Sequence, residues 1–94
     1  MTGAQRAKLR AMANGIEPVV HIGKDELSDN ILTQADQALT ARELIKCTIL
    51  RTCDTPAREL ADGMAKSLGA ECIQVIGRRF VLYRPSPDEP KITL

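Results

Sequence analysis

Apolar side chains recur along this chain with two different periods, and the alternation of these periods predicts the order of its elements. Stripes with spacings of three and four residues predict helices, whereas short β-branched runs and alternating positions predict strands. The predicted helices cover residues 3–14, the stripe from Ile31 to Leu39, and residues 56–68; the predicted strands cover 18–22, 44–50, 71–76 and 80–84. The predicted order is therefore α-β-α-β-α-β-β.

Helix-end signals accompany each of the three stripes. The run Thr2–Gln5 has the spacing of a capping box, and Ser28 precedes the second stripe as an N-cap residue. Thr55 followed by Pro56 predicts an N-cap and a proline at the first helical position, and Gly69 predicts the end of that helix. These signals place the helices independently of the apolar period.

Element order predicts the fold class. Strands joined through helices favour right-handed crossovers between parallel neighbours, whereas the last two strands must pair antiparallel through a tight turn that begins at Gly77. We expect an α/β fold in which a single-layer, mixed four-stranded sheet is packed with helices. One domain covers residues 1–85, and residues 86–94 form a short, extended, acidic and proline-rich tail.

The chemistry-bearing residues predict no enzyme. Cys47, Cys53 and Cys72 are odd in number and lie too far apart for a disulfide framework or paired metal ligands, and His21 is the only histidine. We expect buried free thiols in a reducing cytoplasm, no metal, no cofactor and no catalytic constellation. No apolar run has the length of a signal sequence core or a membrane span, so a cytoplasmic protein is expected.

Aromatic content and charge change this picture in opposite directions. Phe80 and Tyr83 are the only aromatic residues, which excludes base stacking on several exposed rings. The formal net charge is only +1, but its distribution is uneven, with +3 over residues 1–24, −4 over residues 25–43 and +2 over residues 44–94. Basic ends and an acidic middle leave room for contact with a polyanion.

Several ordered segments resemble the CRM domain, the YhbY-type RNA-binding fold. They are EPVVHIGK at 17–24, ELIK at 43–46, QVIGR at 74–78 and VLYRP at 81–85. The resemblance extends over residues 2–85 and implies the same element order. Stand-alone bacterial members of this family are associated with precursors of the large ribosomal subunit, and plant organelle relatives act in intron splicing. The resemblance thus implies a small protein that binds structured ribosomal RNA during assembly of the large subunit.

The family signature is a GxxG loop after the first strand, and this chain departs from it. Gly23 occupies the first glycine position, but Glu26 occupies the second. Backbone amides of such a loop can hold phosphate, whereas the carboxylates of Asp25, Glu26 and Asp29 would repel it. Two interpretations stay open: Gly23 and Lys24 contact RNA, or the loop is a well-capped turn with a solvated lysine.

The candidate RNA contacts are cations and one loop glycine. They are Arg6, Lys8, Arg10, Gly23, Lys24, Lys46, Arg78 and Arg79. Arg6 and Arg10 share a helix face, and Lys46 points away from its apolar neighbours. Each cation can instead be a solvated surface charge or a guard on a turn. We expect His21 to be packed or at a sheet end, and Arg84 to be structural.

A different class of function fits the same pattern. The replaced glycine and the acidic second helix are also compatible with a protein-interaction module that docks on a ribosomal protein or self-associates without contacting RNA. The sequence leaves the RNA element, the assembly step and the oligomeric state open.

Overall fold

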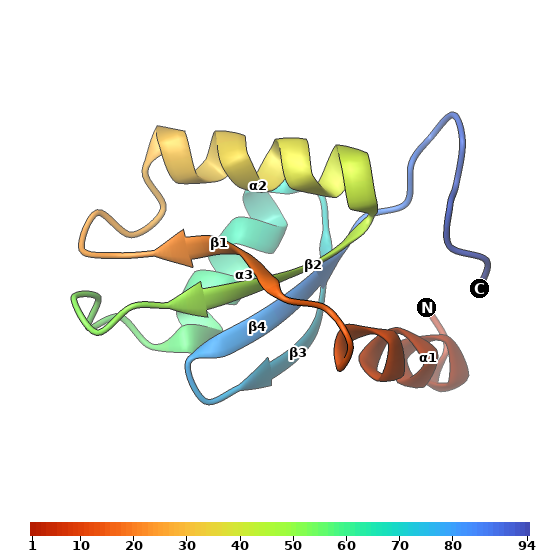
Figure 1. Ribbon diagram of the computed structural model, residues 1–94, viewed down its shortest axis with the longest axis horizontal. Coiled ribbons are helices and arrows are strands. Elements are labelled where there is room, and N and C mark those ends of the chain that lie inside the picture. The colour runs from red at the N-terminus through yellow and green to blue at the C-terminus, as the bar shows by residue number, and fades with distance from the viewer.

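The computed structural model describes residues 1–94 and shows three helices and four strands in one layered arrangement (Figure 1). The elements are α1 (Gly3–Ala13), β1 (Pro18–Ile22), α2 (Asp29–Arg42), β2 (Leu44–Ile49), α3 (Ala57–Leu68), β3 (Glu71–Ile76) and β4 (Arg79–Tyr83). All four strands belong to one mixed sheet. The predicted fold class and the order α-β-α-β-α-β-β are confirmed.

Strand order within the sheet is β1-β2-β4-β3. The crossover through α2 makes β1 and β2 parallel neighbours, as predicted, and the turn at Gly77 makes β3 and β4 antiparallel. The expectation that every helix-linked pair lies side by side is wrong for β2 and β3, because β4 inserts between them and pairs antiparallel with β2. As a consequence, β1 and β3 are the two edge strands.

The two faces of the sheet are covered unequally. Helices α2 and α3 pack on one face over a core cluster of 14 buried residues, among them Ile45, Cys47 and Phe80. On the other face α1 contributes Leu9 to a smaller cluster of 6 buried residues, and it lies under only one end of the sheet (Figure 1). No helix covers the rest of this second face. Along β2, the residues that point to this face are Leu44, which is buried under α1, and then Lys46 and Thr48, which lie on the uncovered part.

Two of the three predicted helix starts are confirmed. Thr2 and Gln5 form the predicted capping box, and the Ser28 hydroxyl accepts a hydrogen bond from the backbone N–H of Ile31. The third prediction is wrong by one residue, because α3 begins at Ala57 with Pro56 as its N-cap and no side-chain cap. The Thr55 hydroxyl donates instead to the Glu26 carboxylate in another loop.

Residues beyond Tyr83 contain no helix or strand, yet they pack against the domain. The side chain of Glu43 is fully buried and accepts hydrogen bonds from the backbone N–H groups of Ser86 (2.6 Å), Lys91 (2.5 Å) and Ile92 (2.9 Å). These bonds, led by that from Ser86, hold the pKa of Glu43 below its ordinary value. Glu43 therefore acts as the anchor that folds the tail back near α1.

Candidate nucleic-acid interface

Three connections meet at one end of the sheet: the β1–α2 loop (residues 23–28), the β2–α3 loop (residues 50–56) and the β3–β4 turn (Gly77–Arg78). The backbone N–H of Leu50 donates to the carbonyl of Ile22 (2.8 Å), and that of Ile49 donates to the carbonyl of Arg78 (2.7 Å). Parallel strands end at the same edge of a sheet, and the antiparallel β4 starts there. Segments far apart in the sequence therefore form one loop end.

Arg78 is built into this loop end. Its Nε donates to the carbonyl of Ile49 (3.1 Å), and its Nη2 donates to the carbonyls of Leu50 and Cys53, the latter at 2.9 Å. These bonds use three of the five guanidinium donors and leave Nη1 directed elsewhere. The main role of Arg78 in the fold is to hold the β2–α3 loop, so only Nη1 is available for an RNA contact.

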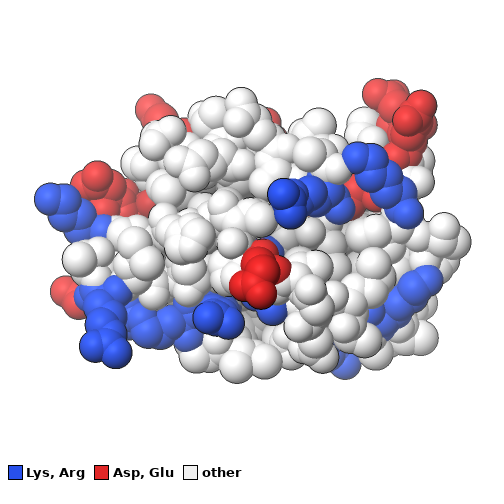
Figure 2. Space-filling view, viewed as in Figure 1, with Lys and Arg blue, Asp and Glu red and all other residues white.

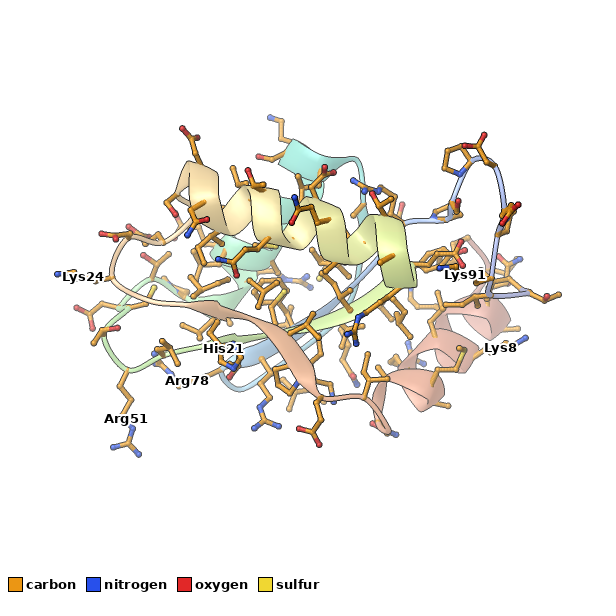
Figure 3. The ribbon with its side chains drawn as sticks, turned by 45° about the horizontal axis from the view of Figure 1, so that its top comes forward. Lys8, His21, Lys24, Arg51, Arg78 and Lys91 are labelled. Atoms are coloured by element: carbon orange, nitrogen blue, oxygen red, sulfur yellow. The ribbon has the colours of Figure 1, made fainter.

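In the β1–α2 loop, Glu26 stands at the position of the second GxxG glycine, and its backbone has a conformation that glycine adopts most easily. Glu26 has φ 51°, in the left-handed region that favours glycine, and its carboxylate accepts the hydrogen bond from Thr55. A Cβ at Gly23 would lie 3.4 Å from the Thr52 hydroxyl, which shows that the β1–α2 and β2–α3 loops are in contact at this point. Lys24 extends from the tip of this loop into solvent (Figure 3).

The uncovered part of the second sheet face, called here the open sheet face, is polar and basic. It is formed by His21, Lys46, Thr48, Gln74, Ile76 and Arg79. The first row across the strands reads His21, Thr48, Arg79 and Ile76, and Lys46 lies opposite Val81 in the next row. A hollow of about 170 Å³ opens between Lys46, Arg79 and Asn14 at the end of α1.

Lys46 has the orientation that alternation predicted, away from the core cluster on the helix-covered face, and Arg79 lies on the same face of the sheet. Neither side chain belongs to any of the three ion pairs in the structure, Arg6–Glu71, Arg58–Asp62 and Arg84–Asp36. His21 also lies on this face, near the end of the edge strand β1, and is exposed, so of the two expectations, packed or at a sheet end, the second one fits. The reason is that α1 lies under the other end of the sheet and nothing covers β1 at this position.

The three cations of α1 differ in their contacts. Arg6 donates to the carbonyl of Cys72 (2.7 Å) and pairs with Glu71 (3.3 Å), while Lys8 donates to the carbonyl of Thr93 in the tail. Arg10 has no such partner and lies one turn after Arg6 on the same flank of the helix. Arg10 is thus the cation of α1 whose side chain makes no hydrogen bond or ion pair within the chain.

Arg51 was not among the predicted contacts, yet it projects into solvent from the β2–α3 loop at the loop end (Figure 3). The signal that could have found it is its place two residues after β2, because the parallel pairing brings it to the same edge as Lys24. Figure 2 shows Lys and Arg side chains at this end of the molecule beside Asp and Glu side chains, with further Lys and Arg side chains along the lower side of the view.

Both aromatic rings and two of the three thiols, Cys47 and Cys53, are buried, whereas Cys72 is only half-buried, so the expectation of buried thiols is wrong for Cys72. Phe80 and Tyr83 are 1% and 5% exposed, so neither ring offers a stacking platform. Burial raises the pKa of the Tyr83 hydroxyl and raises that of the Cys47 thiol to about 12, and it also raises the pKa of Cys72. A thiol with a raised pKa stays protonated at neutral pH and is a poor nucleophile.

No helix of the structure combines the length and apolar character needed to cross a membrane.

Comparison with known proteins is consistent over the full length of the chain. It is 35% identical to the Bacillus subtilis protein named "Probable RNA-binding protein YqeI" over 94 residues, covering 100% of this chain and 98% of the relative. It is 32% identical to a protein of Haemophilus influenzae named as an RNA-binding protein, covering 96% and 90% of the two chains.

Structural comparison agrees. The solution structure of a Staphylococcus aureus protein described as a candidate RNA-binding protein superposes with a TM-score of 0.83 at 37% identity, covering 100% of this chain and 98% of that one. The sequence profile of the CRS1 / YhbY (CRM) domain matches residues 1–84. The protein described here is a member of the CRM domain family.

Proposed function

We propose that this protein binds structured RNA through its phosphate backbone, and that the RNA is ribosomal RNA of the large subunit or its precursor. The observation that carries the proposal is the open sheet face with its adjoining loop end, where cations without ion-pair partners lie side by side. Lys46 and Arg79 belong to the strands, and Arg51 extends from the loop end. Family membership and the names of the relatives support RNA as the ligand.

Phosphate contact is favoured over base reading. Single-stranded RNA is recognised mainly by stacking its bases on exposed aromatic rings, and the only two rings of this chain are buried. Lysine and arginine side chains on a sheet surface can instead follow a phosphate backbone whose course is set by RNA structure. The ligand therefore belongs to the structured class, and the protein acts as a binding module rather than as an enzyme, without metal or cofactor.

The choice of ribosomal RNA rests on the family. The family resemblance implies association with precursors of the large subunit, as for its stand-alone bacterial members, and this chain covers 98% of the Bacillus subtilis relative. A cytoplasmic location in which ribosomes are assembled belongs to the same proposal.

The first experiment measures binding of a fluorescein-labelled hairpin RNA by anisotropy at several salt concentrations. If Arg10, Lys46, Arg51 and Arg79 each neutralise one phosphate, the logarithm of the association constant should fall against the logarithm of salt with a slope of about −3 to −4. A variant with alanine at all four positions should lose most of this dependence. Lys66→Ala is the matched control, because Lys66 is exposed on α3 over the opposite face. Binding that does not change with salt would contradict the proposal.

The second experiment tests the choice of ribosomal RNA. Lysate is separated on a sucrose gradient with and without ribonuclease treatment. Sedimentation with large-subunit particles that is abolished by ribonuclease supports the proposal. Absence from these particles would refute the ribosomal part.

A protein-interaction role is the second candidate, and an apolar groove favours it. A groove of about 260 Å³ lies between α1, β2 and the tail, lined mainly by hydrophobic residues that include Met12, Ile16 and Ile92. Retention on a ribosomal protein after complete digestion of RNA would support this alternative instead.

A further inference from the structure

We infer that bound RNA backbone crosses the open sheet face over Lys46 and Arg79, and that Glu26 directs it there by excluding phosphate from the β1–α2 loop. This inference rests on the proposed RNA binding and specifies its route. It departs from what the GxxG resemblance implies, because the loop of that motif would then not be the phosphate-binding element in this chain.

The two hollows that adjoin these segments differ in charge. The hollow on the open sheet face is lined by seven residues that include Lys46 and Arg79 and no carboxylate. The hollow at the loop end has a volume of about 480 Å³ and is lined by Lys24 together with two carboxylates, Asp25 and Glu26. A phosphate is attracted by the first set of charges and meets net repulsion at the second.

The strands add no negative charge to the open sheet face. Glu71 is the only acidic residue in the four strands, and Arg6 neutralises it at 3.3 Å. Lys46 and Arg79 lie on neighbouring strands, because Lys46 pairs with Val81, two residues after Arg79. Side chains in such a diagonal arrangement are roughly 7–8 Å apart, close enough for both to contact one stretch of backbone.

The shape of this face also suits an extended ligand. α1 ends at Ala13, and the next residue, Asn14, lines the hollow at its border and does not fill it. Arg10 and Asn14 lie one turn apart on a common flank of the helix, so Arg10 extends the row of cations along the rim. Ile76 is 62% exposed on the other margin and offers an apolar contact to ribose.

A phosphate-binding loop presents backbone N–H groups that have no partner within the protein. In the β1–α2 loop, side chains of the protein itself occupy this region. Ser28 caps the backbone N–H of Ile31, and Asp29 lies in the first turn of α2, where its charge complements the helix dipole. The Glu26 carboxylate is fixed by Thr55, so it does not swing away when an anion approaches. Both effects disfavour phosphate at this helix N-terminus.

The experiment compares three changes in binding to the fluorescein-labelled hairpin RNA. Lys46→Gln with Arg79→Gln keeps the side-chain stems and removes two charges; it should weaken binding about tenfold and reduce the salt slope by about 2. Lys24→Gln should change affinity less than about twofold, since its charge lies outside the route. Glu26→Gln keeps the size of the side chain while removing the negative charge, and it should strengthen binding at low salt.

Glu26→Gly provides the matched variant, because it also restores the second glycine. If charge is the cause, Glu26→Gln and Glu26→Gly should gain similarly, and the Lys24 charge should become important in both backgrounds. Equal losses for Lys24→Gln and the Lys46, Arg79 double variant would overturn the route, as would unchanged affinity in Glu26→Gln. If the wild-type protein shows no salt-dependent binding to RNA at all, the proposed function fails, which is a distinguishable result.

Discussion

Arg78 allows structural and RNA-binding roles to be separated within a single turn. Its guanidinium donates to the carbonyls of Ile49, Leu50 and Cys53, which lie 29, 28 and 25 residues away in sequence. Arg79 is the adjacent residue, carries the same charge, is exposed and takes part in none of the ion pairs. Alanine at either position changes the net charge equally, so a difference in stability measures the contacts of Arg78.

The size of this difference follows from the hydrogen bonds. Each intramolecular bond contributes about 0.5–1.5 kcal/mol net, and Arg78 is exposed to solvent, which favours the lower half of that range. Three bonds together should contribute about 2 kcal/mol to the free energy of unfolding. For a domain of this size, each kcal/mol shifts Tm by about 4–8 °C, so Arg78→Ala should lower Tm by about 8–16 °C. Arg79→Ala should remain within about 0.5 kcal/mol of the wild type.

Urea and thermal unfolding, followed by circular dichroism, provide the assay. Amide hydrogen exchange adds local information, because residues 50–56 should lose protection in Arg78→Ala before the core strands do. Arg78→Lys keeps the charge but lacks the planar set of donors, so it should recover less than half of the loss. Equal stability of Arg78→Ala and Arg79→Ala would refute the assignment of Arg78 to loop support. In RNA binding the order should reverse, with Arg79→Ala the more damaging of the two when both proteins are folded.

Three further changes test other parts of the fold. The folded-state pKa of Glu43 lies below its ordinary value of 4.5. The contribution of Glu43 to stability is therefore complete above pH 4.5 and is lost as the pH falls through the lowered value. The Tm difference between wild type and Glu43→Gln should shrink on acidification, and a constant difference would contradict the role of Glu43 as the anchor of the tail. Leu9→Ala should destabilise the fold by about 2–5 kcal/mol, because Leu9 of α1 is completely buried against the sheet, and a smaller loss in urea unfolding would show that α1 is loosely docked. Gly69→Ala should cost about 1 kcal/mol because φ is +64° in open space, whereas Gly3→Ala, also in open space but without a positive φ, should be neutral or stabilising in the same unfolding assay.

Features governed by short-range rules could be predicted from the sequence. The capping box at Thr2 joins groups three residues apart, and the alternation of Ile45, Lys46 and Cys47 needs only the two-residue period of a strand. The end of α3 at Gly69 follows from its left-handed conformation. Each of these depends on the backbone close to the residue concerned, so neighbouring letters are sufficient.

Strand order depends on pairing across the chain and could not be deduced in this way. The hairpin of β3 and β4 can join the sheet through either of its strands, and local pattern does not distinguish the two. The structure places β4 next to β2, where Phe80 and Leu82 complete the core cluster under α2 and α3. The error at Thr55 has a similar origin, since its hydroxyl bonds to Glu26, 29 residues earlier, rather than to its own helix.

The candidate site shows the same limit for charged residues. The sequence does not show whether a lysine or arginine side chain will donate hydrogen bonds to groups of its own chain or remain available to a ligand. The cations that donate to groups of this chain are Arg6, Lys8, Arg58, Arg78, Arg84 and Lys91. The sequence predicts three of them, Arg6, Lys8 and Arg78, as RNA contacts. It predicts a structural role for Arg84, which joins the end of β4 to α2 through Asp36 and Thr40.

A net charge of +1 is compatible with binding a polyanion if opposite charges are separated by more than the distance over which salt screens them. That distance is about 8 Å at physiological ionic strength. The acidic residues Asp25, Glu26 and Asp29 belong to the loop and first turn of α2, whereas Lys46 and Arg79 lie on the sheet face that α2 does not cover. A phosphate between Lys46 and Arg79 would therefore meet these two cations at contact distance, so its binding depends on them more than on the total charge. Weak long-range attraction combined with strong local contact favours a ligand that fits the face over one that is merely anionic.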